Sequence, residues 1–172
     1  MSRAALIPLA AAFAFQTAAL PLYRVGPAGP DFVLAVLLYL GIHDGTRRSL
    51  AAAAASGCLL DFVSIEPFGV FALGYLAALG AARSCRRALS GPGSRDPAPS
   101  VRAVSAALGI LAAALARVAL SDEGASRALP GSLGSAAYTA ALVPIVFALL
   151  APSRTRLLEE PIPGRRRGWS FG

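Results

Sequence analysis

Apolar residues fill six stretches of the chain, and short segments rich in Gly, Pro, Ser and charged residues separate them. Several stretches reach or approach the roughly 20 residues that an α-helix needs to cross a bilayer. The pattern therefore predicts an all-α membrane protein, a single bundle of six transmembrane helices over residues 1–151, with five helices as the alternative. The predicted spans cover about 4–23, 31–43, 49–65, 67–82, 101–120 and 134–151.

Three features of this pattern leave alternatives open. The second span (31–43) is short, so it needs the preceding residues 28–30 or a locally thinned bilayer to cross. The third and fourth spans are joined by a tight turn at 64–67, and together they could form a re-entrant pair. The first span follows Arg3 as a signal peptide would, but it is longer than a usual signal-peptide core, which favours a retained helix.

The composition excludes both a soluble domain and a disordered chain. Hydrophobic residues make up 56% and charged residues 15%, whereas about 25% are charged in a typical soluble domain. So few polar residues cannot cover a soluble surface, and the apolar surface is ample for burial. The net charge of +7 does not indicate nucleic-acid binding, because the basic residues lie between and after the apolar runs rather than on one face.

All sixteen basic residues are arginines, and their distribution predicts the orientation. With six spans and the N-terminus inside, thirteen fall on the cytoplasmic side, and the predicted external segments carry acidic residues such as Asp31 and Asp61. The positive-inside rule then places both termini in the cytoplasm. We also expect a flexible cytoplasmic linker over 88–100 and a basic, disordered tail over 152–172, which anionic lipids would attract. The thirteen are Arg3, Arg47, Arg48, Arg83, Arg86, Arg87, Arg95, Arg102, Arg154, Arg156, Arg165, Arg166 and Arg167.

Motifs of common enzyme and metal sites are missing from the sequence. Without lysine the chain has no Walker A loop, no Schiff base and no Ser-Lys dyad. The single histidine, His43, cannot form the usual zinc sites, and Cys58 and Cys85 form neither a CxxC pair nor a disulfide framework. We therefore predict a protein that is not an enzyme and that binds no cofactor and no metal.

One catalytic alternative involves Asp31 and Asp61, at the outer ends of two predicted helices. Two carboxylates that share a proton could hydrolyse peptides, as in aspartic peptidases. Structural roles are favoured instead. Asp31 follows Pro30 and suits a helix N-cap, and Asp61 could pair with Arg117 or Arg24.

Other residues indicate close helix packing within the bundle. Gln16 lies in the middle of the first span, where its amide needs a hydrogen-bond partner, expected within the bundle rather than on another protein. Small residues spaced four apart allow helix backbones to approach each other in lipid. These pairs are Ala53/Gly57, Gly74/Ala78 and Ala112/Ala116.

Two local motifs carry a resemblance to a known family. The first is Gly29-Pro30-Asp31-Phe32 followed by Leu-rich sequence to Tyr39, and the second runs from Gly57 through Asp61 and Ser64 to Pro67-Phe68-Gly69. With Gln16 and a last span that contains Pro144, they resemble the rod shape-determining protein MreD family. The second motif is similar to the family's G-x-x-L-D-L-x-S-G-x-x-L-G pattern, although Ile65 stands in place of the glycine after the serine. The specific part covers 29–69, and the fourth and fifth spans match in hydropathy alone.

The resemblance implies a non-catalytic scaffold in the bacterial inner membrane that serves the cell-elongation, peptidoglycan-synthesising machinery. Its implied partners are a bitopic MreC-like protein and, indirectly, MreB, RodA and a class B penicillin-binding protein. It also implies a six-helix fold related to the S components of energy-coupling-factor transporters, so a vitamin-binding S component is the main rival function. The residues expected to have structural or partner-binding roles are Gln16, Pro30, Asp31, Tyr39, Gly57, Asp61, Ser64, Pro67, Gly69 and Pro144.

Overall fold

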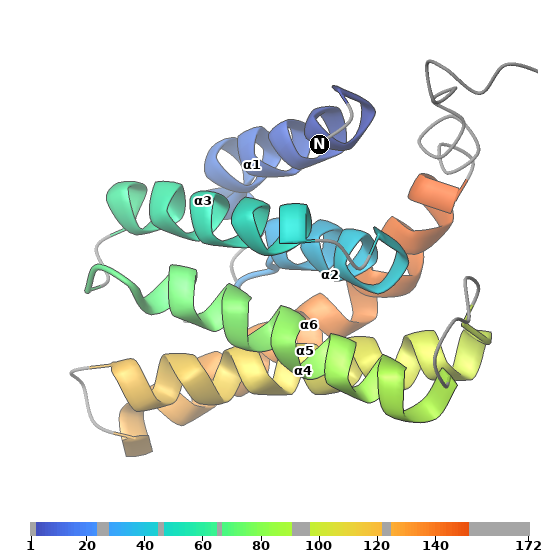
Figure 1. Cartoon of the computed structure of the whole chain (residues 1–172). Helices are drawn as coiled ribbons and strands as arrows, with labels where there is room; N and C mark the ends of the chain where they lie inside the picture. The colour runs from blue at the N-terminus through green and yellow to red at the C-terminus, as the bar shows by residue number, and fades with distance from the viewer. Residues whose placement is uncertain are drawn as a thin grey trace, which may run out of the picture.

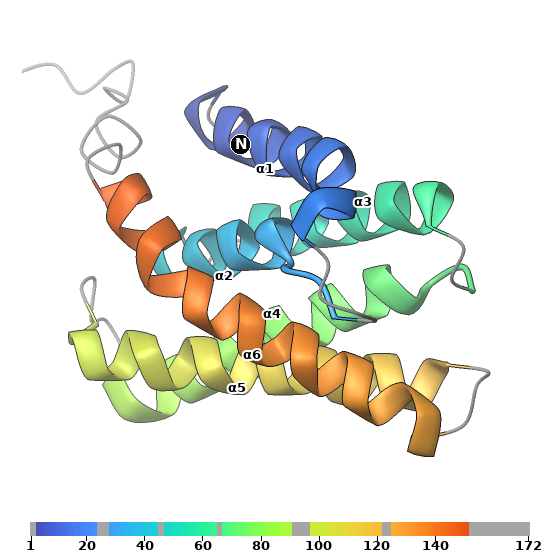
Figure 2. The same cartoon turned by 180° about the vertical axis from the view of Figure 1, so that it is seen from behind.

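The computed structural model describes residues 3–23, 28–44, 47–64, 67–90, 97–121 and 125–151, and each consecutive helix runs opposite to the one before it (Figure 1 and Figure 2). The described part is all-helical, with six helices, as predicted. The helices are α1 (Arg3–Tyr23), α2 (Phe32–Asp44), α3 (Arg47–Val63), α4 (Val70–Ser90), α5 (Pro99–Leu120) and α6 (Ala125–Leu150).

Two helices are longer than hydropathy predicted. α4 continues to Ser90 through its arginines, because arginine is a good helix former and helix formation does not require apolar residues. α6 begins at Ala125 rather than 134, since its first turns contain polar residues and Pro130, which a hydropathy profile excludes from a span. The predicted linker is correspondingly shorter, because 88–90 and 99–100 are helical. Residues 91–96 and the predicted tail over 152–172 lie outside the described residues.

α2 is the central helix of the fold. It packs against all five other helices, and every residue from Val33 to Ile42 is buried. A helix that is apolar on all sides is typical of such a central position. Because protein surrounds α2, its 13 residues do not have to match the thickness of a bilayer. Its shortness is therefore explained by burial.

α5 and α6 supply the most apolar outer surface. Both are long and apolar enough to cross a membrane, over Pro99–Leu120 and Ser126–Leu150, and only 33% and 11% of their most apolar windows are buried. α1 and α2 contain shorter apolar segments. Large side chains such as Leu115 and Leu149 point outward, as expected where a lipid tail rather than water covers the surface.

Small residues bring the helix backbones together, but not all at the predicted positions. Gly57 and Gly74 are buried as expected, with Ala53 and Ala78. Ala112 and Ala116 are only half-buried. On α5 the close contact is made instead at Gly109, where a Cβ atom would lie 2.5 Å from Leu38 Cδ2 and 2.9 Å from the Ala78 carbonyl oxygen.

Gly57 permits the closest approach, between α3 and the first turn of α4. A Cβ atom at this position would lie 2.3 Å from Ala72 Cα and 2.6 Å from Ala72 N. Both are backbone atoms, so no side-chain rotation could make room. Only glycine therefore allows α4 to begin where it does.

Gly57→Ala is expected to destabilise the protein by about 1–3 kcal/mol, because the added methyl group must displace the backbone of α4. The matched control is Gly80→Ala, a helical glycine of α4 where a Cβ atom would meet nothing within 4 Å. This control should be neutral or stabilise by up to about 1 kcal/mol, through helix propensity. Thermal unfolding in detergent measures both variants, and equal melting temperatures would contradict the proposed close contact.

Candidate functional site

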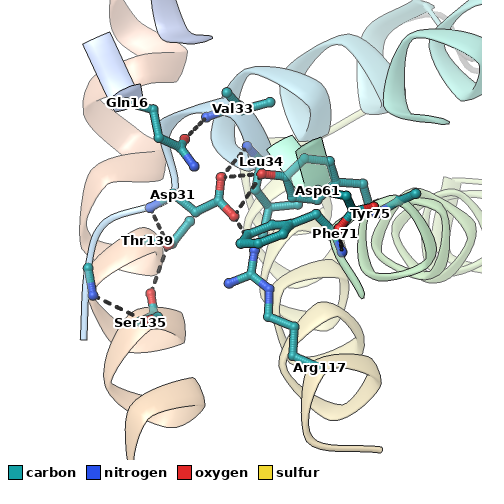
Figure 3. Close-up of polar contacts among 12 residues, drawn as sticks. Gln16, Asp31, Val33, Leu34, Asp61, Phe71, Tyr75, Arg117, Ser135 and Thr139 are labelled. Atoms are coloured by element: carbon teal, nitrogen blue, oxygen red, sulfur yellow. Dashed lines mark hydrogen bonds and ion pairs between the residues drawn. The ribbon is translucent and has the colours of Figure 1, made fainter. Parts of the chain in front are cut away.

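Two buried carboxylates lie at one end of the bundle, which we call the carboxylate end, where α2 and α4 begin. Asp31 directly precedes α2, and Asp61 lies in the last turn of α3. Their exposed fractions are 3% and 5%. Buried carboxylates need hydrogen-bond donors or cations around them, and each of these two has its own set (Figure 3).

The Asp31 carboxylate joins three helices. It accepts a hydrogen bond from the Leu34 backbone N–H at 2.9 Å, which makes it the N-cap of α2, as predicted. The Tyr75 hydroxyl of α4 lies 2.8 and 3.0 Å from its two oxygens. The Arg117 guanidinium of α5 forms an ion pair with it. The charge of Asp31 is thus neutralised, and its oxygens are engaged, by groups within the bundle.

Three more backbone N–H groups at or just before the start of α2 also find side-chain acceptors. Val33 N–H donates to Gln16 Oε1 of α1 at 2.9 Å, so the predicted hydrogen bond of Gln16 within the bundle is confirmed. Asp31 N–H donates to Thr139 Oγ1 of α6 at 3.1 Å, and the Gly29 N–H donates to Ser135 Oγ at 3.2 Å. These bonds satisfy groups that a helix start otherwise leaves without partners.

Asp61 is also a helix cap, but for a helix other than its own. It accepts hydrogen bonds from the Phe71 and Ala72 backbone N–H groups, at 2.9 and 3.3 Å, in the first turn of α4. A carboxylate at this position also interacts favourably with the positive end of the helix dipole. The predicted pairing of Asp61 with Arg117 is wrong, because Arg117 forms its ion pair with Asp31 instead. Arg24 lies outside the described residues.

Arg117 connects the two carboxylates through Phe71. Its guanidinium carbon lies 4.7 Å from the centre of the Phe71 ring, a distance typical of a cation–π interaction. The backbone N–H of the same phenylalanine donates to Asp61. The ion pair at α2 and the cap at α4 therefore share one residue.

The segment between α3 and α4 contains a glycine that its turn requires and a serine that contacts Asp61. Gly69 has a φ of +103°, in the left-handed region that favours glycine. Ser64 is half-buried, and its hydroxyl lies 3.4 Å from the Asp61 carbonyl oxygen, whereas Pro67 is exposed. Ile65 and Glu66 lie outside the described residues.

Two of the candidate residues lie away from the carboxylate end. Tyr39 lies in the second half of α2, where its hydroxyl donates to the Leu150 carbonyl oxygen at 3.0 Å and its ring contacts His43, with 4.3 Å between the centroids. Pro144 is exposed within α6. The remaining candidates gather at the carboxylate end in two groups: Gln16, Pro30 and Asp31 around α2, and Gly57, Asp61, Ser64, Pro67 and Gly69 around the start of α4.

Sequence reasoning missed Tyr75, Thr139 and Ser135. Tyr75 and Thr139 are 0% and 1% exposed, whereas Tyr138, the residue next to Thr139 on α6, is half-buried. An available signal was that these are polar residues within apolar spans, where such groups need partners. The sequence alone does not say which of two adjacent polar residues faces the core.

The carboxylates of this site are held by hydrogen bonds and an ion pair within the protein. Both carboxylates accept hydrogen bonds from separate donors, which favours structural roles over the shared proton of an aspartic peptidase. Within the described residues there is no group of three or more His, Cys, Asp and Glu side chains that could hold a metal ion.

Asp61→Ala should destabilise the protein by about 1–3 kcal/mol, because it leaves the two N–H groups in the first turn of α4 without acceptors. Asp61→Asn keeps a side-chain oxygen and should cost less. Ser64→Ala is the local control, since that hydroxyl makes only a long contact. Melting temperatures measured in detergent rank the stability of the three variants. An Asp61→Ala variant as stable as the Ser64→Ala control would refute the capping role.

The carboxylate end lies largely within a segment with recognisable relatives. The family model of the rod shape-determining protein MreD matches residues 4–90, just over half of the chain. This range includes Gln16, Asp31, Asp61 and Tyr75, whereas Arg117 and Thr139 lie beyond it. No curated protein and no solved structure gives a significant match. On this match, the chain belongs to the rod shape-determining protein MreD family.

Proposed function

We propose that this protein is a non-catalytic scaffold of the cell-elongation machinery, which binds an MreC-like bitopic partner at the carboxylate end. Membership of the family carries a role in rod-shape determination. Through the MreC-like partner, the scaffold connects indirectly with MreB, RodA and a class B penicillin-binding protein. The protein resides in the bacterial inner membrane as a multi-pass protein with both termini in the cytoplasm, so the carboxylate end faces outward.

The observation that carries this proposal is an exposed apolar surface at the carboxylate end, which we call the aromatic tip. It consists of Phe62, Val63 and Phe68, whose exposed fractions are 76%, 63% and 66%. The Phe62 and Phe68 rings contact each other edge to face, with 5.2 Å between centroids. Aromatic residues of this kind are enriched at the centres of protein interfaces.

The surroundings of the aromatic tip support a docking role because they hold it in a fixed shape. Asp61, adjacent to Phe62, is bonded to the first turn of α4, and Gly69, adjacent to Phe68, adopts the conformation that the turn requires. A surface that is already ordered loses little conformational entropy when a partner binds. The aromatic tip lies beyond the buried caps, at the end of the helices. A partner that crosses the membrane once can reach it there.

The rival function as a vitamin-binding S component requires polar groups that face a ligand. At the carboxylate end, Tyr75 and Arg117 are both bonded to Asp31, and Thr139 accepts from the backbone of Asp31. The polar groups that would recognise a vitamin are therefore engaged within the bundle. This arrangement favours the scaffold.

The test is a double variant, Phe62→Ser with Phe68→Ser, in tagged protein purified from native membranes in mild detergent. We expect the amount of MreC-like partner, quantified by mass spectrometry, to fall at least about tenfold, because truncating a hot-spot residue of an interface costs about 2 kcal/mol or more. The melting temperature should change little, since both rings are exposed. The matched control is Leu89→Ser with Leu149→Ser, two exposed apolar residues outside the tip.

Two results would contradict the proposal. Full recovery of the partner with the double variant would show that the aromatic tip is not the binding surface. Recovery of paired ATPases with a membrane coupling subunit, in place of an MreC-like protein, would assign the chain to vitamin transport.

A further inference from the structure

The end of the bundle opposite the carboxylates is rich in arginine, and we call it the arginine end. The last turns of α2, α4 and α6 and the first turns of α3 and α5 lie on this side (Figure 1). Among the arginines on this side, six belong to α3, α4 and α5. They are Arg47 and Arg48 of α3, Arg83, Arg86 and Arg87 of α4, and Arg102 of α5.

Two of these arginines hold the helix ends together. Arg83 is 9% exposed, and its Nη2 donates to Ser49 Oγ in the first turn of α3. Arg86 Nη1 donates to the Ile42 carbonyl oxygen in the last turn of α2. A cation is favourable at a helix C-terminus, where carbonyl groups lack partners within the helix. Arg83 and Arg86 are therefore part of the fold.

The bond between Arg83 and Ser49 brings three further arginines toward one another. Arg87 lies one turn beyond Arg83 on the same face of α4, and Arg47 and Arg48 directly precede Ser49 on α3. All three are exposed. Among the described residues no ion pair is found for Arg47, Arg48 or Arg87, and the ion pair of Arg117 with Asp31 lies at the other end of the bundle. Like charges gathered in this way repel one another, and a bound anion would relieve the repulsion.

The position of these three arginines along the helix axes indicates which kind of anion would bind them. The apolar part of α4 stops at Ala82, directly before Arg83, and that of α3 starts at Leu50, directly after Ser49. The three exposed arginines thus lie just beyond the apolar part of the bundle, where lipid headgroups meet a membrane protein. Guanidinium groups also bind phosphate through paired hydrogen bonds.

We propose that Arg47, Arg48 and Arg87 form a binding site for the headgroup phosphate of an anionic phospholipid. Arg83 and Arg86 position this site by joining α4 to α3 and α2, and Arg102 adds positive charge on the neighbouring helix. An acidic segment of a cytoplasmic protein is the competing ligand. The position at the apolar boundary favours the lipid, since a protein partner would find its contacts farther from the membrane.

The test uses the full chain purified in detergent and titrated with phosphatidylglycerol, with bound lipids counted by native mass spectrometry. The triple variant Arg47→Gln, Arg48→Gln and Arg87→Gln should bind this lipid at least about tenfold more weakly, because each basic residue near anionic headgroups contributes to attraction. Binding of zwitterionic phosphatidylcholine should not change. The matched control is Arg127→Gln, an exposed arginine near the start of α6, which should leave phosphatidylglycerol binding intact.

Three results would overturn the proposal. The triple variant could bind phosphatidylglycerol as the wild type does, or Arg127→Gln could weaken binding equally, which would indicate net charge rather than a site. The triple variant could also lose a cytoplasmic protein partner while its lipid binding stays unchanged, which would assign the surface to that protein. Because the titration needs neither the MreC-like partner nor a membrane orientation, its failure is separate from a failure of the proposed function.

Discussion

The start of α2 is buried inside the protein, and the rest of the carboxylate end follows from that constraint. The first N–H groups of any helix lack partners within it, and at α2 they lie among the buried residues Asp31, Val33 and Leu34. Side chains must therefore provide acceptors, and they come from several helices. Gln16 of α1 and Thr139 of α6 each accept one backbone N–H. Asp31 accepts a third, from Leu34.

The buried Asp31 carboxylate that caps α2 needs a positive partner and hydrogen-bond donors of its own. A buried charge is costly unless it is paired and hydrogen-bonded, and Asp31 obtains both from Tyr75 of α4 and Arg117 of α5. One helix start thus connects α1, α4, α5 and α6 to α2. α3 joins the same assembly through Asp61, which caps α4 beside Phe71, and Phe71 in turn packs under Arg117. Such a network fixes one arrangement of helices, which suits the proposed role of presenting a surface to a partner.

The features that depend on local sequence could be predicted from it. Hydropathy placed the six helices, and Pro30 followed by Asp31 indicated a helix cap, because both preferences act within a few residues. The need of Gln16 for a partner within the bundle followed from the cost of an unpaired amide in an apolar span. The sequence motifs also indicated the family.

The features that depend on how helices meet could not be predicted. Arg117 could have paired with either aspartate, and the choice of Asp31 is made by packing between residues far apart in the chain. The burial of Thr139 rather than Tyr138 depends on the rotation of α6 about its axis. α6 begins earlier than hydropathy indicated because its first turns are helical without being apolar. The first two of these outcomes depend on a neighbouring helix, and the third on helix formation that hydropathy does not detect.

The central claim is that the paired charges of Asp31 and Arg117 hold the helices together at the carboxylate end. A double-mutant cycle with Asp31→Asn, Arg117→Gln and the combination tests it most directly, with unfolding free energies measured in detergent. Asparagine keeps an oxygen for the cap of α2, so the cycle isolates the charge interaction. Each single variant should cost about 3–5 kcal/mol, because one buried charge loses its partner, and the double variant should cost less than their sum by about 1–3 kcal/mol. Strictly additive costs would contradict the account.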